Sequence, residues 1–132
     1  MKKIIICDID GTLAFKCDRE VFDFSLAEND KINKPIAKLL ELYNGENYGT
    51  VFVTGRPEHY REVTENWLNN YHIDYVSLFM RPNNDNRSQK IVKKEIFIKY
   101  IKPIYEIELV IDDNDSLIEM WKTEFGLNCL QV

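Results

Sequence analysis

Residues 4–12 of the chain read Ile4-Ile5-Ile6-Cys7-Asp8-Ile9-Asp10-Gly11-Thr12. The first four are apolar without alternation, which is typical of a strand buried on both faces in a parallel sheet. Two aspartates follow one residue apart, and their like charges are costly to bring together unless a cation lies between them. Gly11 permits a tight turn or a close approach to a ligand. The stretch favours a metal-assisted site at the end of a central strand, with an Asx turn as the alternative.

Strand-like and helical segments alternate along the rest of the chain. Strands are expected at residues 48–53, 75–80, 109–111 and 128–132, and helices at 34–45, 57–71, 91–101 and 117–125. This order predicts an α/β fold, a Rossmann-like open parallel sheet of five strands flanked by helices. Residues 13–32 show no sustained period and are expected to form an irregular loop, with a helix start offered at 30–33. Ligands bind such sheets at the carboxyl ends of the strands, where strand order reverses.

Composition narrows the classes of protein to which the chain can belong. Its 132 residues suit a single domain, residues 1–132, and 45% hydrophobic with 30% charged residues is ordinary for a soluble protein. No apolar run approaches the roughly 20 residues that cross a bilayer, and Asp8 interrupts any signal peptide. An intracellular, cytoplasmic location with no membrane partner is therefore expected. Three cysteines without metal spacing argue against a disulfide framework. The net charge of −5 argues against a broad nucleic-acid groove but permits a pocket for one strand end.

Three of the expected strands end in polar clusters, which are Asp8 with Asp10, Thr54-Gly55-Arg56, and Asp112-Asp113. Each has a purely structural alternative, because a Thr-Gly pair is usually a turn and an acidic pair often caps a helix. Together they suit phosphoryl transfer. Carboxylates hold a hard divalent cation, and one carboxylate attacks phosphorus to form an aspartyl-phosphate. The Thr54 hydroxyl and the Gly55 N–H would bind phosphate oxygens. Lys93 or Lys94 would balance the charge, unless that pair only forms a solvated helix face.

The order and spacing of these motifs resemble those of the haloacid dehalogenase superfamily of phosphatases. Over nearly its whole length the chain is similar to a narrower family, the 3′-phosphatase domains of bacteriophage-type polynucleotide kinase/phosphatases. The segments that carry this closer similarity are Met80-Arg81-Pro82, Asp85-Asn86-Arg87, Val92-Lys93-Lys94-Glu95-Ile96-Phe97, Glu119-Met120-Trp121 and Cys129-Leu130-Gln131-Val132.

The resemblance implies a role for each matching residue. Asp8 would be the nucleophile, and Asp10 would protonate the leaving oxygen and then activate water. Thr54 would bind the phosphate and Lys93 would neutralise it. Mg²⁺ would be held by Asp8, the Asp10 carbonyl, Asp113 and, directly or through water, Asp112. Gly55 and four arginines become candidates for substrate contact, namely Arg19, Arg56, Arg81 and Arg87.

Two departures from the family pattern stand out. The family has an aspartate four residues before the motif lysine, where this chain has Gln89. The chain also contains no G-x-x-x-x-G-K-[ST], so no 5′-kinase activity is expected from it. Residues 13–32 are too few for a folded cap domain of about 50 residues or more and are expected to form a flap or minimal cap. An open site of this kind suits a bulky substrate.

Three functions follow as hypotheses. The leading one is a Mg²⁺-dependent phosphatase that removes the 3′-phosphate from DNA or RNA ends during nucleic-acid repair, in a bacteriophage-like or other viral setting within a host cell. The second is a phosphatase for free nucleotides or other small phosphoesters. The third is a weakly catalytic phosphate-binding subunit partnered with a separate kinase, and a ligase is a further expected partner. Phe22 and Phe24 are the aromatic residues expected near a substrate, because their loop follows the nucleophile.

Overall fold

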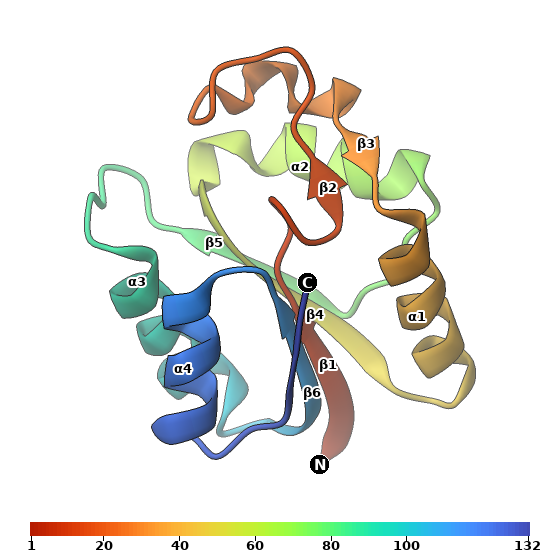
Figure 1. Cartoon of the computed structure of the whole chain (residues 1–132), viewed down its shortest axis with the longest axis vertical. Helices are drawn as coiled ribbons and strands as arrows, with labels where there is room; N and C mark the ends of the chain where they lie inside the picture. Colours follow the sequence, from red (N-terminus) through yellow and green to blue (C-terminus); the bar gives the residue numbers. More distant parts are fainter.

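A five-stranded parallel sheet forms the centre of the computed structural model, which describes residues 1–132. The strand order is β5-β4-β1-β6-β7, so the prediction of an open parallel sheet is confirmed (Figure 1). The strands are β1 (Lys2–Cys7), β4 (Gly49–Pro57), β5 (Ser77–Arg81), β6 (Tyr105–Asp112) and β7 (Cys129–Gln131). The chain runs from β1 outward to β4 and β5 and then returns to the other side of β1, so strand order reverses between β1 and β6.

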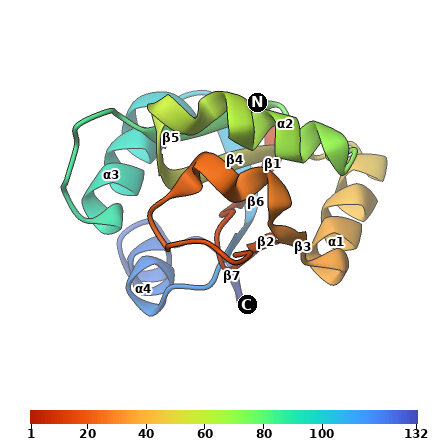
Figure 2. The ribbon, with the colours of Figure 1, turned by 90° about the horizontal axis from the view of Figure 1, so that it is seen from above.

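Helices cover both faces of this sheet (Figures 1 and 2). One apolar cluster joins one face to α1 and α2, and a second joins the opposite face to α3 and α4. The helices are α1 (Lys34–Gly45), α2 (Arg61–Asn70), α3 (Gln89–Ile96) and α4 (Asp115–Thr123), with a 3-10 turn η2 (Glu58–Tyr60) before α2 and a π-helical turn η3 (Phe97–Ile101) after α3. None of the helices combines the length and the apolar character needed to cross a membrane.

Strand β1 explains the unbroken apolar run near the N-terminus. Ile5 and Cys7 belong to the cluster under α1 and α2, whereas Ile4 and Ile6 belong to the cluster under α3 and α4. Successive side chains of a strand point to opposite faces, so a strand covered on both faces needs apolar residues at every position. The run ends at Cys7, and the next residue, Asp8, begins the site.

Several element ends differ from those expected. Strand β4 continues to Pro57 and contains the Thr54-Gly55-Arg56 motif, because its pairing with β5 resumes between Pro57 and Arg81 after a register shift. Strand β6 begins at Tyr105, four residues before the expected start, because its first residues pair with Lys2 and Lys3 at the N-terminal end of β1. Helix α1, by contrast, begins at the expected Lys34, and Asn33 of the 30–33 segment is its N-cap. Asp30 of the same segment is buried.

Residues 13–32 form a flap with structure of its own, which corrects the expectation of an irregular loop. The flap contains a two-stranded antiparallel ladder, β2 (Ala14–Phe15) with β3 (Lys31–Ile32), and a 3-10 helix η1 (Phe24–Asn29) between them. It lies over the carboxyl ends of β1, β4 and β6, as the view from above shows (Figure 2). The flap therefore encloses one side of the edge where the polar clusters gather.

Candidate active site

The three polar clusters meet at one edge of the sheet. Because β1 lies between β4 and β6, their carboxyl ends place Asp8, Thr54 and Asp112 next to one another. All three side chains are buried, at 6%, 1% and 2% exposure respectively. The Asp8 N–H donates to the Ile111 carbonyl at 3.0 Å, which continues the β1–β6 ladder up to Asp8. Buried polar groups need partners. The Thr54 hydroxyl accepts from the Arg56 N–H at 3.1 Å, and the two aspartates face a charged partner.

Lys93 of α3 supplies the positive charge. Its ammonium lies 2.9 Å from Asp8 Oδ1 and 3.3 Å from Asp112 Oδ2, and the residue is 1% exposed. Burial alone would lower the pKa of Lys93, but the two carboxylates outweigh it and raise the pKa above its ordinary value. Lys94 instead points outward and pairs with Glu124. Of the two lysines considered from the sequence, only Lys93 reaches the site.

The carboxylates outnumber the cation beside them. Oxygen atoms of Asp8, Asp112 and Asp113 lie within 4.8 Å of one another, and the Lys93 ammonium pairs with the first two of these residues. Burial raises the pKa of Asp8, the Lys93 ammonium opposes this rise, and the nearby Asp112 carboxylate adds to it. An excess of carboxylate oxygens is the donor set that a hard divalent cation takes. These residues therefore fit the metal that the family implies.

Two small residues of the β1 turn keep this acidic cluster tight. Thr12 is fully buried, and its hydroxyl lies 3.3 Å from Asp8 Oδ2 and 3.2 Å from Asp113 Oδ1. Gly11 has a φ of +82°, and a Cβ there would collide with the Asp113 carboxylate. Only glycine adopts this conformation readily and leaves the space that Asp113 occupies. Three residues of the D-x-D-G-T sequence, Asp8, Gly11 and Thr12, thus fit the cluster.

The Asp10 carboxylate turns away from the acidic cluster and toward Arg56 of β4. Arg56 Nε lies 2.9 Å from Asp10 Oδ2, and Arg56 Nη2 lies 2.8 Å from Asp10 Oδ1, which makes the ion pair bidentate. Arg19 of the flap approaches the same oxygen at 3.5 Å. The two aspartates of the motif are therefore held by different partners, Asp8 by a lysine and Asp10 by arginines. The predicted metal contact of Asp10 was through its backbone carbonyl, and it stays a prediction.

A buried carboxylate behind Asp10 orders both arginines. Asp30 is 1% exposed and accepts from Arg19 Nε and Nη2 at 3.0 and 2.8 Å, and from Arg56 Nη2 at 3.3 Å. The Phe24 ring lies 5.0 Å from the Arg19 guanidinium and 5.1 Å from that of Arg56. Arg19 and Arg56 are buried, so in this structure their contacts support Asp10. Their predicted contact with substrate remains a prediction.

The other two candidate arginines lie across the site, Arg81 at the end of β5 and Arg87 on the loop that follows. Arg81 donates to the carbonyl oxygens of Gly55 and Asp85, at 2.9 and 3.0 Å, and to that of Arg87. It thereby ties Gly55 of β4 to the 82–88 loop. Arg87 forms ion pairs with Asp85 and Glu95, which neutralise its charge. Arg81 thus stabilises the loop by hydrogen bonds to neutral carbonyls, whereas Arg87 is paired with two carboxylates. Contact of either arginine with substrate stays a prediction.

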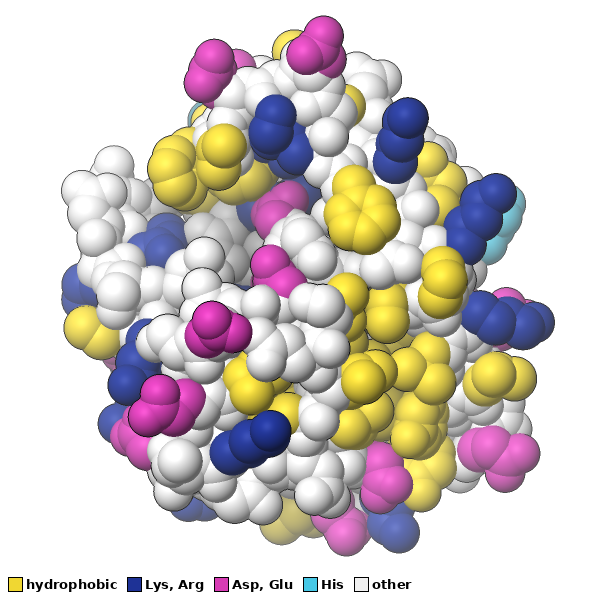
Figure 3. Space-filling model, in the orientation of Figure 1, with side chains coloured by type: hydrophobic (Ala, Val, Ile, Leu, Met, Phe, Trp, Pro, Cys, Tyr) yellow, Lys and Arg dark blue, Asp and Glu magenta, His cyan; other side chains and the backbone are white.

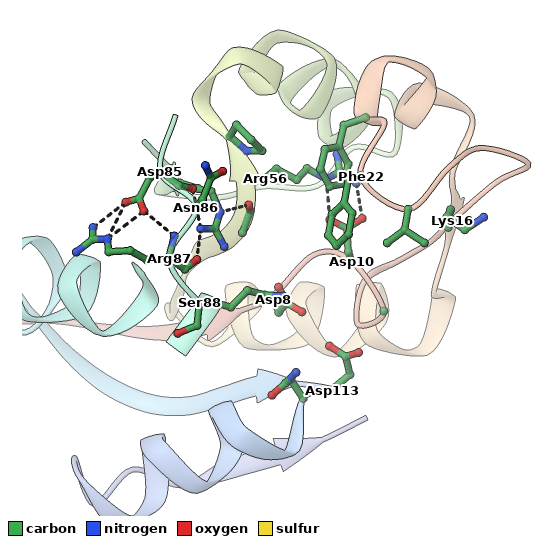
Figure 4. Close-up of a pocket in the computed structure, with 18 of the residues that line it drawn as sticks. Asp8, Asp10, Lys16, Phe22, Arg56, Asp85, Asn86, Arg87, Ser88 and Asp113 are labelled. Atoms are coloured by element: carbon green, nitrogen blue, oxygen red, sulfur yellow. Dashed lines mark hydrogen bonds and ion pairs between the residues drawn. The ribbon is translucent and has the colours of Figure 1, made fainter. Parts of the chain in front are cut away.

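A cavity of about 820 Å³ opens over these groups. Its lining includes Asp8, Asp10 and Asp113, the flap residues Phe15 and Phe22, and on the opposite side the residues 84–89 (Figure 4). Gln89 belongs to this lining, and its side chain packs against Gly55, where an added Cβ would lie 3.1 Å from Gln89 Cδ. The space-filling view shows a hollow beneath the flap with acidic side chains exposed in it (Figure 3).

Sequence reasoning did not assign a role to Asp30, Thr12 or Thr64. Thr64 accepts from Arg56 Nη1 at 3.0 Å, and so completes the buried surroundings of that guanidinium. The sequence did carry a signal for Thr12, because it lies in the same motif, two residues after Asp10. Asp30 had none, since an aspartate shortly before a proline-started helix is typical of a helix cap.

Comparison with known proteins identifies the family of this chain. A family model described as the polynucleotide kinase PNKP phosphatase domain matches residues 2–132. A putative bifunctional polynucleotide kinase/RNA ligase of Autographa californica nuclear polyhedrosis virus is 31% identical over 123 residues, which are 91% of this chain and 18% of the viral protein.

Two solved structures are similar over the whole fold. A chain in the structure of a Pnkp1/Rnl/Hen1 complex superposes with a TM-score of 0.97 at 39% identity, over 100% of this chain and 46% of that one. A chain in a structure of the Pnkp1/Rnl/Hen1 RNA repair complex gives 0.96 at 40% identity, over 99% and 42% respectively. The chain therefore spans less than half the length of these solved chains.

Proposed function

Because the chain belongs to the family of polynucleotide kinase PNKP phosphatase domains, we propose that it removes the 3′-phosphate from polynucleotide ends in a Mg²⁺-dependent reaction. The observation that carries the proposal is the position of Asp8. This carboxylate lies at the end of the central strand, 2.9 Å from the buried ammonium of Lys93, in an acidic cluster below an open cavity. The fold is the haloacid dehalogenase-type phosphatase fold. We propose that phosphate is transferred at Asp8 and the groups around it.

In the first step, Asp8 attacks the phosphorus of the substrate. A P–O bond to the aspartate forms as the bond to the 3′-oxygen breaks, and this gives an aspartyl-phosphate. Lys93, the Thr54 hydroxyl and the Gly55 N–H bind the non-bridging oxygens and balance their charge. Mg²⁺ held by Asp8, Asp113 and Asp112, with the Asp10 carbonyl, would offset the remaining negative charge of the phosphate.

Asp10 moves the protons of both steps. As the acid it donates a proton to the departing 3′-oxygen, and as the base it then takes a proton from the water that hydrolyses the aspartyl-phosphate. Its bidentate pairing with Arg56 supports these tasks by fixing the direction of the carboxylate. Asp30 holds Arg56 in turn and also pairs with Arg19, so the orientation depends on a buried carboxylate behind Asp10.

The form of the site supports a large substrate. Residues 13–32 form only a flap, which we propose as the minimal cap of a single phosphatase unit spanning residues 1–132. The cavity of about 820 Å³ is larger than a phosphate alone requires, which favours a strand end with its nucleoside. DNA or RNA ends in the cytoplasm are the proposed substrates. A kinase or ligase is the proposed protein partner, because the viral relative is described as a polynucleotide kinase/RNA ligase.

Phosphate release tests the proposal. We expect release from a 3′-phosphorylated oligonucleotide to depend on Mg²⁺ and to exceed that from 3′- and 5′-mononucleotides. Asp8→Asn should abolish turnover while the circular dichroism spectrum and melting temperature show a folded protein. Preference for mononucleotides would indicate a phosphatase for small phosphoesters. Substantial turnover by Asp8→Asn would contradict the covalent mechanism, and no turnover by the wild-type protein would indicate a phosphate-binding subunit.

A further inference from the structure

Two side chains of the flap line the cavity without a part in the reaction proposed above. Phe22 is 83% exposed, more than any other large hydrophobic side chain of the chain. Lys16 is also exposed and lines the same cavity. Figure 4 shows both on the flap side, with the ammonium of Lys16 directed away from Asp8. They therefore lie where a substrate would extend beyond its reacting phosphate.

The two phenylalanines of the flap differ in their surroundings. Phe24 is 7% exposed, and its ring packs on the guanidinium groups of Arg19 and Arg56. Phe22 has no aromatic or cationic partner in the structure, although it lies only two residues away. An aromatic ring left in water at the mouth of a polar cavity is a surface on which a nucleobase can stack.

Lys16 differs from the neighbouring cations in its charge balance. Arg19 and Arg56 pair with the buried Asp30, and Arg87 pairs with Asp85 and Glu95. The ammonium of Lys16 instead donates to the neutral carbonyls of Cys17 and Arg19, at 3.2 and 2.6 Å. These bonds hold the side chain in place and leave its positive charge uncompensated. An ammonium has three donors, so one remains for an anion.

We propose that Phe22 and Lys16 form a strand-binding subsite on the flap. Phe22 stacks on the base of the 3′-terminal nucleotide, and Lys16 binds the phosphodiester on the 5′ side of that nucleotide. This inference rests on the proposed function and adds to it a reason for preferring polynucleotides. A nucleoside 3′-monophosphate lacks the second phosphate, and an abasic end lacks the base. The subsite is thus a determinant of specificity, separate from the groups that act on the reacting phosphate.

Four 3′-phosphorylated substrates separate the two contacts: an oligonucleotide, the same oligonucleotide with an abasic 3′-terminal residue, a nucleoside 3′,5′-bisphosphate and a nucleoside 3′-monophosphate. Phe22→Ala should raise KM about tenfold for the three substrates with a terminal base and leave the abasic end unchanged. Phe22→Tyr should restore wild-type values. Lys16→Ala should raise KM for all except the 3′-monophosphate, and should lower the slope of log KM against log salt for the oligonucleotide by about 0.7–1.

Matched controls come from the same flap. Leu26 and Lys31 are exposed flap residues outside the cavity lining, so Leu26→Ala and Lys31→Ala should leave every KM unchanged. If Phe22→Ala raised KM equally for the oligonucleotide with a terminal base and for the one with an abasic end, the stacking contact would be overturned. If Lys16→Ala raised KM equally for the nucleoside 3′-monophosphate and the 3′,5′-bisphosphate, the phosphodiester contact would be overturned.

The proposed function and the subsite can fail separately. Wild-type turnover of all four substrates with one common KM would overturn the subsite and leave the phosphatase function standing. If the wild-type protein released no phosphate at all, the phosphatase function would fail. Fluorescence anisotropy with a labelled 3′-phosphorylated oligonucleotide would then test the subsite by binding. Phe22→Ala and Lys16→Ala would each have to weaken that binding for the inference to hold.

Discussion

Arg56 binds both carboxylate oxygens of Asp10, at 2.9 and 2.8 Å, across 46 residues of sequence. A guanidinium that contacts both oxygens fixes the plane of a carboxylate as well as its position. The pair is buried on the Arg56 side, where Asp30 and Thr64 occupy further donors of the guanidinium. The orientation of the proposed proton-transfer group is thus a property of the packed interior.

Replacement of Arg56 by lysine should lower kcat by about 10²-fold with little change in KM, because a single ammonium cannot hold both oxygens of Asp10. The defect should be smaller for p-nitrophenyl phosphate, whose leaving group departs without protonation. Burst-phase and steady-state kinetics on both substrates measure this difference. Arg61→Lys is the control, since Arg61 pairs with Glu58 and Glu65 outside the cavity. An equal defect on both substrates would contradict a positioning role.

Substitution of Lys93, but not of Lys94, should abolish activity. Lys93→Ala removes the ammonium that faces Asp8 and Asp112, and leaves two buried carboxylates without their partner. We expect a loss of at least about 10²-fold in kcat/KM, in line with the removal of one preorganised charge-stabilising group. Lys94→Ala breaks only an exposed pair with Glu124, so its kinetics and melting temperature should match the wild type. Comparable losses in the two variants would contradict the assignment.

Mg²⁺ should raise the melting temperature through the acidic cluster, because a ligand that binds only the folded state stabilises it by mass action. Asp113→Asn should remove most of this rise, since it takes one charge from the three clustered carboxylates. Asp115→Asn is the matched control: Asp115 starts α4 two residues later and accepts from Gln131. Differential scanning fluorimetry with Mg²⁺ and with EDTA makes the comparison. An undiminished rise in Asp113→Asn would place the cation elsewhere.

Asp30 should contribute to stability at neutral pH and lose this contribution in acid. Burial raises the pKa of Asp30, but hydrogen bonds from Arg19 and Cys17 outweigh it, and the pKa lies below the ordinary 3.8. Its ionised form therefore stabilises the fold above about pH 4, and the stabilisation is lost as pH falls through the lowered folded-state pKa. Asp30→Asn should lower the free energy of unfolding by about 3–5 kcal/mol at pH 7, because it leaves buried arginines unpaired.

The pH dependence distinguishes this effect from a general loss of packing. Urea unfolding between pH 3 and pH 7 should give a flatter profile for Asp30→Asn than for the wild-type protein. Asp18→Asn, at an exposed flap position, should leave the profile unchanged. A variant profile parallel to that of the wild type would contradict the role assigned to Asp30.

Local patterns were sufficient for the five-stranded sheet and for the polar clusters near the carboxyl ends of three of its strands. Continuous apolar residues in β1 require cover on both faces, and alternating helices and strands then leave few topologies other than a parallel sheet. The carboxyl ends of parallel strands share one edge of the sheet, so the sequence alone predicts that Asp8, Thr54 and Asp112 lie close together. Helical phase also held information about the lysines. Lys93 lies one turn before the buried Phe97, whereas Lys94 lies one turn before the exposed Ile98.

Residues close together in the sequence were enough to predict the class of chemistry, because the end of a strand and the turn after it bring Asp8 and Asp10 to the same edge of the sheet. The partners of those aspartates came only from the packed fold. Arg56 reaches Asp10 across 46 residues, Lys93 reaches Asp8 across 85, and Asp30 orders two arginines from the flap. Such pairs depend on how helices and flap pack on the sheet, and on the need of each buried charge for a counter-charge, which no local pattern records.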